Sequence, residues 1–159
     1  MKRAGLALTL FVFAFLSVSG AHAQAKSSLV GVWKITEVVG PNPIEKPQPS
    51  IYIFTAKHYS IMSVSGAASR KTDVNDRSSD SEKLAAWTPF TAHSGTYDSS
   101  GNEITLRQIV AKNPSVMLPG NFVTFEVTMA SDRVMRLRQK ANQQGPITAP
   151  FTAIFERLE

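Results

Sequence analysis

A chain of 159 residues without cysteine forms no disulfide, thiolate nucleophile or thiolate metal site, so a packed core has to supply its stability. The formal net charge is only +5 at pH 7, and the basic residues are scattered. Both features argue against nucleic acid as a partner.

Residues 1–23 have the arrangement of a secretory signal peptide. A charged start, MKR, precedes an apolar run at 6–18 and a small-x-small site, AHA, at 21–23. The run is shorter than the roughly 20 apolar residues of a membrane span, so no stable membrane insertion is expected after cleavage. We therefore predict a periplasmic or secreted protein whose mature domain is 24–159. Loss of two basic residues lowers the 17 to 15 against 12 acidic ones, a net charge of +3.

The mature chain is predicted to be mostly β-strand. The segment 121–129 alternates with period two, for example, with Val123, Phe125 and Val127 on one face. Turn residues such as Gly101 and Asn102 separate the candidate strands. Eight strands are expected, at 28–39, 50–55, 58–65, 93–98, 103–110, 121–129, 133–139 and 151–158.

One short helix is expected between the third and fourth strands. Residues 66–81 are polar and lack apolar periodicity, which indicates a loop. Asp80 and Ser81 are candidate caps for a helix at 82–87, and Pro89 disfavours its continuation. We expect the segment 66–92 to cover one mouth of the fold and to gate entry.

The connections between the strands are mostly hairpin-sized, which favours an antiparallel sheet. Eight such strands can close into an up-and-down β-barrel wide enough for one small ligand. The fold class predicted is therefore an all-β, eight-stranded antiparallel barrel with one short helix. A two-sheet sandwich is the alternative.

The first strand contains Gly31-Val32-Trp33, in which the glycine and the indole share a face. Glycine inside a strand indicates a bend or the close approach of another group. A deeply placed indole needs a partner for its N–H or a cation over its face. Arg157 on the last strand can be that cation if the first and last strands are neighbours. Gly31, Trp33 and Arg157 are therefore predicted to be structural.

Several motifs, in this order, resemble those of lipocalins and other calycins, and more closely those of bacterial lipocalin-like domain proteins. The chain has an L-x-G-x-W pattern at 29–33, a tyrosine-containing hairpin at 52–60, Ser-Gly-x-Tyr at 94–97 and Phe-Glu-Arg at 155–157. His58 stands where that hairpin commonly has glycine. The resemblance covers most of 28–158 and implies a ligand-binding barrel.

The sequence offers little catalytic or metal-binding chemistry. Beyond the predicted signal peptide the histidines are His58 and His93, which have no His-x-His or His-Glu-x-x-His spacing. Neither a Gly-x-Ser-x-Gly elbow nor a glycine-rich phosphate loop occurs. No metal or cofactor is expected, and no catalytic residue is assigned.

The barrel interior is the predicted site. Its lining is expected to include Trp33, Ile35, Phe54, Tyr97, Leu106, Phe125 and Leu137. Arg107, Thr124 and Glu126 are polar candidates for the lumen, although a shift of one residue in register would place them outside. An Arg107 inside would indicate an anionic ligand group. The residues predicted to contact a ligand are Phe54, His93, Tyr97, Arg107, Phe125 and Glu126.

Three functions are compatible with these features. The first is an exported protein that binds a small, hydrophobic molecule in the barrel. The second is an enzyme of the same fold, an isomerase or cyclase on a lipophilic compound, in which His93, Tyr97 or Glu126 would transfer protons. The third is a structural barrel that is filled by its own side chains.

Overall fold

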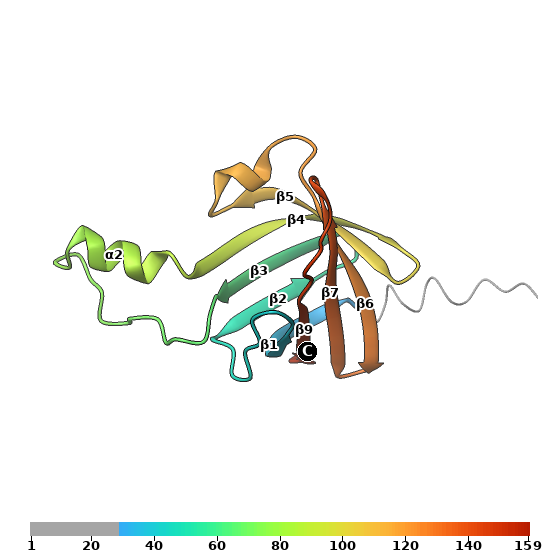
Figure 1. The fold of residues 1–159 in the computed structure, drawn as a ribbon, viewed down its shortest axis with the longest axis horizontal. Coiled ribbons are helices and arrows are strands. Elements are labelled where there is room, and N and C mark those ends of the chain that lie inside the picture. Colours follow the sequence, from blue (N-terminus) through green and yellow to red (C-terminus); the bar gives the residue numbers. More distant parts are fainter. Residues whose placement is uncertain (1–28) are drawn as a thin grey trace, which may run out of the picture.

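The computed structural model describes residues 29–159, so the predicted signal peptide lies outside the described residues. Strands occupy most of this part of the chain (Figure 1). The strands are β1 (Gly31–Val39), β2 (Ser50–Phe54), β3 (His58–Val64), β4 (Phe90–Ser100), β5 (Glu103–Ala111), β6 (Val123–Ser131), β7 (Val134–Asn142), β8 (Gly145–Pro146) and β9 (Thr152–Arg157). The helix α2 (Asp80–Trp87) lies between β3 and β4, and a 3₁₀ turn, η1 (Pro114–Met117), follows β5.

Eight of these strands close into a barrel. The hydrogen-bonded order is β6-β5-β4-β3-β2-β1-β9-β7, and an additional pairing of β6 with β7 joins the two ends. Every pairing is antiparallel, and the long strands pair with their neighbours in the chain. The predicted eight-stranded up-and-down barrel is confirmed, and the sandwich alternative is wrong. The two-residue β8 adds only a short pairing beside β7.

Strand β4 begins at Phe90, three residues before the predicted start, because Phe90 pairs with Val64 at the end of β3. Its register against β5 shifts between Ser94 and Gly95. At Gly95 a Cβ atom would lie 1.9 Å from the carbonyl oxygen of Arg107. Only glycine allows β5 to approach this closely, so Gly95 fixes the bulge.

The inner face of the barrel carries the apolar core. The alternation of strand residues points one set inward, as in β5, where Ile104 and Leu106 are each 2% exposed. All seven predicted lining residues are either buried or packed against this core. The largest fully buried side chains of this core are Trp33, Phe54, Phe155, Ile104, Leu106 and Met135.

Gly31, Trp33 and Arg157 close the end of the barrel where β1 begins and β9 ends. Trp33 is 0% exposed, and its indole N–H donates to the Leu29 carbonyl at 2.9 Å. Trp33 pairs with Arg157 across β1 and β9, and the guanidinium lies 4.1 Å from the centre of the indole. A Cβ at Gly31 would lie 2.3 Å from Nη1 of Arg157. The glycine therefore leaves the space that the stacked guanidinium occupies.

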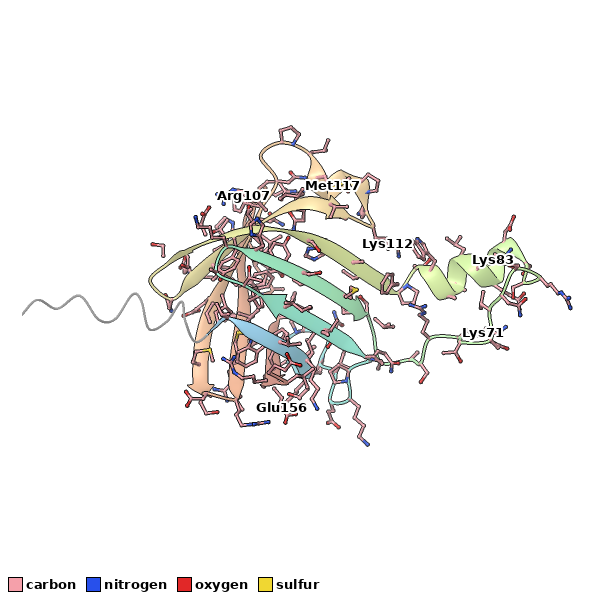
Figure 2. The ribbon with its side chains drawn as sticks, turned by 180° about the vertical axis from the view of Figure 1, so that it is seen from behind. Lys71, Lys83, Arg107, Lys112, Met117 and Glu156 are labelled. Atoms are coloured by element: carbon pink, nitrogen blue, oxygen red, sulfur yellow. The ribbon has the colours of Figure 1, made fainter. Side chains whose placement is uncertain are left out.

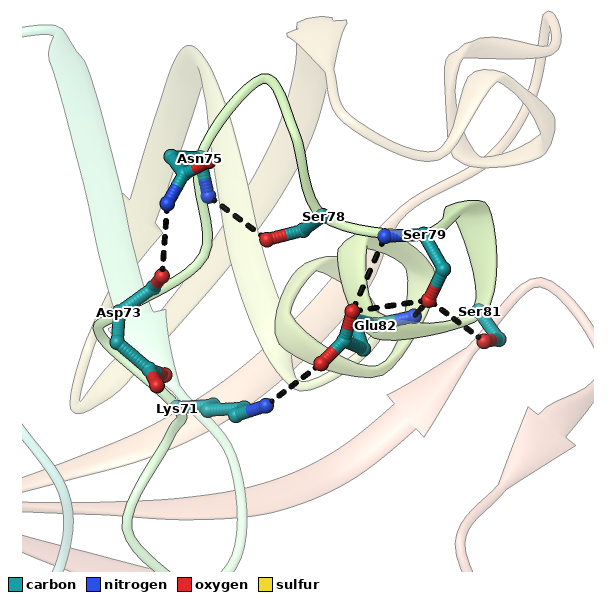
Figure 3. Close-up of polar contacts among 7 residues, drawn as sticks. All are labelled: Lys71, Asp73, Asn75, Ser78, Ser79, Ser81 and Glu82. Carbon is teal, nitrogen blue, oxygen red and sulfur yellow. Dashed lines mark hydrogen bonds and ion pairs between the residues drawn. The ribbon is translucent and has the colours of Figure 1, made fainter.

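Helix α2 projects away from the strands (Figure 1). Its N-cap is Ser79, one residue before the predicted caps, because Ser79 and Glu82 form a reciprocal capping box. Glu82 also pairs with Lys71 at 2.8 Å, which ties the preceding loop to the helix (Figure 3). At the other end, Nζ of Lys112 donates to the Trp87 and Phe90 carbonyls. The helix is thus anchored at its two ends. Contrary to the prediction for 66–92, it does not lie over the mouth of the barrel (Figure 1).

Candidate ligand cavity

The barrel is hollow in one half. A cavity of about 190 Å³ has a lining of eight apolar residues and four with polar groups. The apolar members are Ile61, Leu106, Val123, Phe125, Leu137, Phe151, Ala153 and Phe155, and the polar members are Tyr52, His93, Gln108 and Gln139. No charged carboxylate, lysine or arginine lines it. The cavity therefore suits an uncharged, largely apolar occupant.

Strand direction places the cavity toward the end from which α2 emerges. Strand β4 runs from that end toward the closed one, so His93, near its start, lies nearer the mouth than Tyr97. Strands β5 and β7 run the opposite way, so Gln108 and Gln139 lie nearer the mouth than Leu106 and Leu137. The polar side chains consequently gather toward the mouth, above an apolar floor.

Tyr59 and His93 form a hydrogen-bonded pair across β3 and β4. The Tyr59 hydroxyl lies 3.1 Å from Nδ1 of His93, and the two rings meet edge to face with centres 5.5 Å apart. Burial lowers the pKa of His93, so the imidazole is neutral at neutral pH. Burial also raises the pKa of Tyr59, which keeps its hydroxyl protonated. The pair fixes the ring of His93 and leaves Nε2 without a partner among the described residues.

The other polar lining groups differ in how fully they are paired. Burial raises the pKa of Tyr52 to about 12, against the opposing effect of a hydrogen bond with Ser63. The side-chain amides of Gln108 and Gln139 have no hydrogen-bond partner among the described residues. No fully buried side-chain nitrogen or oxygen in the described chain lacks a partner, so these amides are accessible to solvent. They are groups that a ligand in the cavity can bond.

The sequence-predicted site residues separate into three groups. His93 and Phe125 line the cavity. Phe54 and Tyr97 lie deeper, in the packed floor, where their rings meet edge to face with centres 5.7 Å apart. The Tyr97 hydroxyl donates to the Thr55 carbonyl at 2.6 Å. These two residues support the cavity from below and do not line it.

Arg107 and Glu126 lie on the outer face of the barrel, which corrects the expectation that they enter the lumen. Arg107 pairs with Asp98 and lies outside the strands (Figure 2). Glu126 accepts a hydrogen bond from the side-chain amide of Asn102 at 3.1 Å and lies 3.7 Å from Arg138. The inner positions are taken by Leu106 and Phe125, because neighbours in a strand face opposite ways. The anionic ligand group inferred from an inward Arg107 therefore has no support.

Sequence reasoning missed Tyr52, Gln108 and Gln139 as lining residues, and Tyr59 as the partner of His93. Gln108 and Gln139 lie two residues beyond Leu106 and Leu137, which were predicted to face inward. Extending the same alternation by one step would have found both glutamines. The contact between Tyr59 and His93 depends on the pairing of β3 with β4 and has no signal within either strand alone.

Within residues 29–159 no three histidine, aspartate or glutamate side chains are grouped so that they could hold a metal ion. No helix in the same range has the length and apolar character needed to cross a membrane.

Comparison with known proteins shows likeness in fold only. No family model matches the sequence, and no curated protein matches it. Among solved structures, a lipocalin-like protein from Bacteroides uniformis is 20% identical, with a TM-score of 0.47 over 82% of this chain and 99% of that one. A protein from Bacteroides eggerthii is 14% identical, with a TM-score of 0.46 over 80% and 98%. A redesigned β-barrel is 12% identical, with a TM-score of 0.43 over 85% and 96%.

Proposed function

We propose that this protein binds a small, largely apolar molecule in the half-hollow barrel. The observation that carries the proposal is the cavity of about 190 Å³, which is apolar below and carries unpartnered polar groups toward its mouth. Ligand sites in proteins combine these two features: apolar area supplies affinity, and a few polar groups set orientation. The packed floor of Trp33, Phe54 and Phe155 closes the opposite end.

The test is to identify what the protein carries. Protein purified from its native host is extracted with organic solvent, and the extract is analysed by mass spectrometry beside that of an Ala153→Leu variant. Ala153 is 4% exposed and lines the cavity, so the larger side chain occupies ligand space. A compound present with the native protein and absent with the variant supports binding. An empty extract together with no fluorescence change on adding hydrophobic dyes would establish the third candidate, a barrel without a ligand.

One observation favours a second candidate, an enzyme that transfers protons. The Tyr59 hydroxyl orients His93, a neutral imidazole that lines the cavity with a free ring nitrogen. In the tautomer whose Nδ1–H donates to the Tyr59 oxygen, Nε2 carries the lone pair and can accept a proton from a carbon acid. Cyclohexanone incubated with the protein in deuterated water would then exchange its α-protons for deuterium, and NMR would follow the loss of the proton signal. The substitution His93→Gln would abolish this exchange. Equal exchange with both proteins would exclude this role.

Export is the remaining part of the proposal. It is supported by the order of charged, apolar and small residues in 1–23. We expect protein recovered from the native host to begin at Gln24 and to fractionate with the periplasm or the medium. N-terminal sequencing checks this, and an intact Met1 in a cytoplasmic fraction would contradict it.

A further inference from the structure

The size of the cavity restricts what can occupy it, if the proposed binding function holds. An engineered apolar cavity of about 150 Å³ accommodates benzene, whereas pockets for drug-sized ligands measure about 300–1,000 Å³. The volume here is about 190 Å³. Scaled from the benzene case, it holds roughly eight non-hydrogen atoms. A single ring with one or two small substituents fits, and a long-chain lipid does not.

The walls favour an aromatic ring over an aliphatic chain. Four of the twelve lining residues are tyrosine or phenylalanine. Two contacts among them are already edge to face: Tyr52 with Phe155 at 4.8 Å and Phe125 with Phe151 at 6.4 Å between ring centres. A ring placed between these pairs extends the same geometry, which stabilises aromatic clusters beyond their buried area.

The polar lining determines the charge and orientation of the guest. No lysine, arginine, aspartate or glutamate faces the cavity, so a charged guest would lose hydration without gaining a counter-charge. The unpartnered amides of Gln108 and Gln139 each offer a donor and an acceptor, which match a hydroxyl or carbonyl group. Both lie on the mouth side of Leu106 and Leu137. The apolar end of a guest would therefore enter first.

We propose that the cavity holds an uncharged, single-ring aromatic molecule, inserted ring first, whose hydroxyl or carbonyl group is bonded by the amides of Gln108 and Gln139. The inference rests on the proposed binding function and adds the chemical class and the direction of the guest.

The experiment measures binding of four probes by calorimetry: 4-methylphenol, 1,4-dimethylbenzene, 4-methylbenzoate and palmitate. The first two have nearly the same shape and differ in one hydroxyl group. We expect 4-methylphenol to bind about fivefold tighter than 1,4-dimethylbenzene, the effect of roughly one net hydrogen bond. The charged 4-methylbenzoate and the long palmitate should not bind.

Two double variants locate the hydrogen bond. Gln108→Leu with Gln139→Leu removes both amides at little change in size, and we expect it to abolish the fivefold preference for the phenol. Gln143→Leu with Gln144→Leu makes the same change at an exposed turn and should preserve the preference. If the cavity double variant does not fold, the two probes compared on the native protein still test the preference.

The outcomes separate the inference from the function on which it rests. Tight binding of palmitate without 4-methylphenol would overturn the single-ring class and leave a binding barrel. Equal binding of the two ring probes by the native protein would overturn the role of the glutamines. Binding of none of the four probes, together with an empty extract from the native host, would overturn both proposals.

Discussion

Single residues set the shape and chemistry of this barrel through contacts that are distant in sequence. Gly31 leaves room for the guanidinium of Arg157, which lies over Trp33 and donates to the Val30 carbonyl at 2.7 Å. Gly95 leaves room for the backbone of β5. His93 is held neutral beside Tyr59 in the cavity wall. Each contact predicts the effect of a substitution.

Stability should fall on acidification because of His93. Burial lowers its folded-state pKa, so below about 6.5, the ordinary histidine value, the unfolded chain binds a proton that the folded chain does not. This contribution is complete above that pH and is lost as pH falls through the folded pKa. Urea unfolding at pH 7.5 and 5.0 measures the change. His93→Gln should reduce the difference, whereas His58→Gln, the same substitution on an exposed residue, should retain it.

Gly95→Ala should destabilise the fold by at least ~2 kcal/mol, because its Cβ meets a backbone oxygen that cannot move without disturbing the pairing of β4 with β5. Gly101→Asn is the control: Gly101 has φ +57°, which asparagine tolerates, and no atom lies within 4 Å of a Cβ there. Its cost should stay below ~1 kcal/mol. Denaturant midpoints compare the two variants, and equal costs would contradict the steric explanation.

At the scale of elements, α2 is stabilised locally and packs little against the barrel. Its first turn is held by the Ser79–Glu82 capping box and by the ion pair of Glu82 with Lys71 (Figure 3). The hydrogen bond from Lys71, followed by those from the backbone and side chain of Ser79, lowers the pKa of Glu82 to about 2. The helix neighbours loop residues 70–74, and its C-terminal end is held by Lys112. Helix stability and barrel stability should therefore be separable.

Ser79→Ala tests this separation. Loss of an N-cap costs a helix about 1 kcal/mol. We expect hydrogen exchange to accelerate about fivefold at Lys83, whose amide bonds the Ser79 carbonyl, while strand amides and the barrel's melting temperature stay unchanged. Ser81→Ala, two residues further on, removes a hydroxyl that contacts Oγ of Ser79 at 3.1 Å but leaves the capping box in place, and it is the matched control. A lower melting temperature in Ser79→Ala alone would show that α2 supports the barrel.

For the whole molecule, closure comes from the pairing of β6 with β7 and of β1 with β9. No residue of the excursion between β3 and β4 lines the cavity. The ends of this excursion are already joined as a hairpin, because Val64 pairs with Phe90 and the Ser65 N–H donates to the Pro89 carbonyl at 2.7 Å. The barrel should accordingly form without it.

Replacing residues 66–88 with Asn-Gly, a two-residue hairpin turn, should leave one cooperative unfolding transition within a few degrees of the native one. Affinity for 4-methylphenol, measured by calorimetry, should be unchanged. A second variant, in which the same residues are replaced by a Gly-Ser linker of the native length, controls for any effect of the tight turn itself. If the variant folds normally but binds 4-methylphenol with a changed association rate, the result would support the gating role that the sequence predicted for this segment.

The sequence by itself determined the number, order and antiparallel pairing of the strands, because period-two alternation and turn residues act locally. It also identified Trp33 and Arg157 as potential partners, since a buried indole and a cation have few ways to be satisfied. The inner faces followed from the same alternation for residues such as Leu106 and Phe125.

Tertiary structure alone decided the rest. Arg107 and Glu126 face outward, as alternation with the inward Leu106 and Phe125 requires, but the register that joins their strands, including the bulge at Gly95, is fixed by the neighbouring strands. The contact of Tyr59 with His93 arises across a strand pair, and the hollow half of the barrel depends on how all eight strands close. A cavity is the volume that packing leaves unfilled, so its position and size depend on every side chain around it.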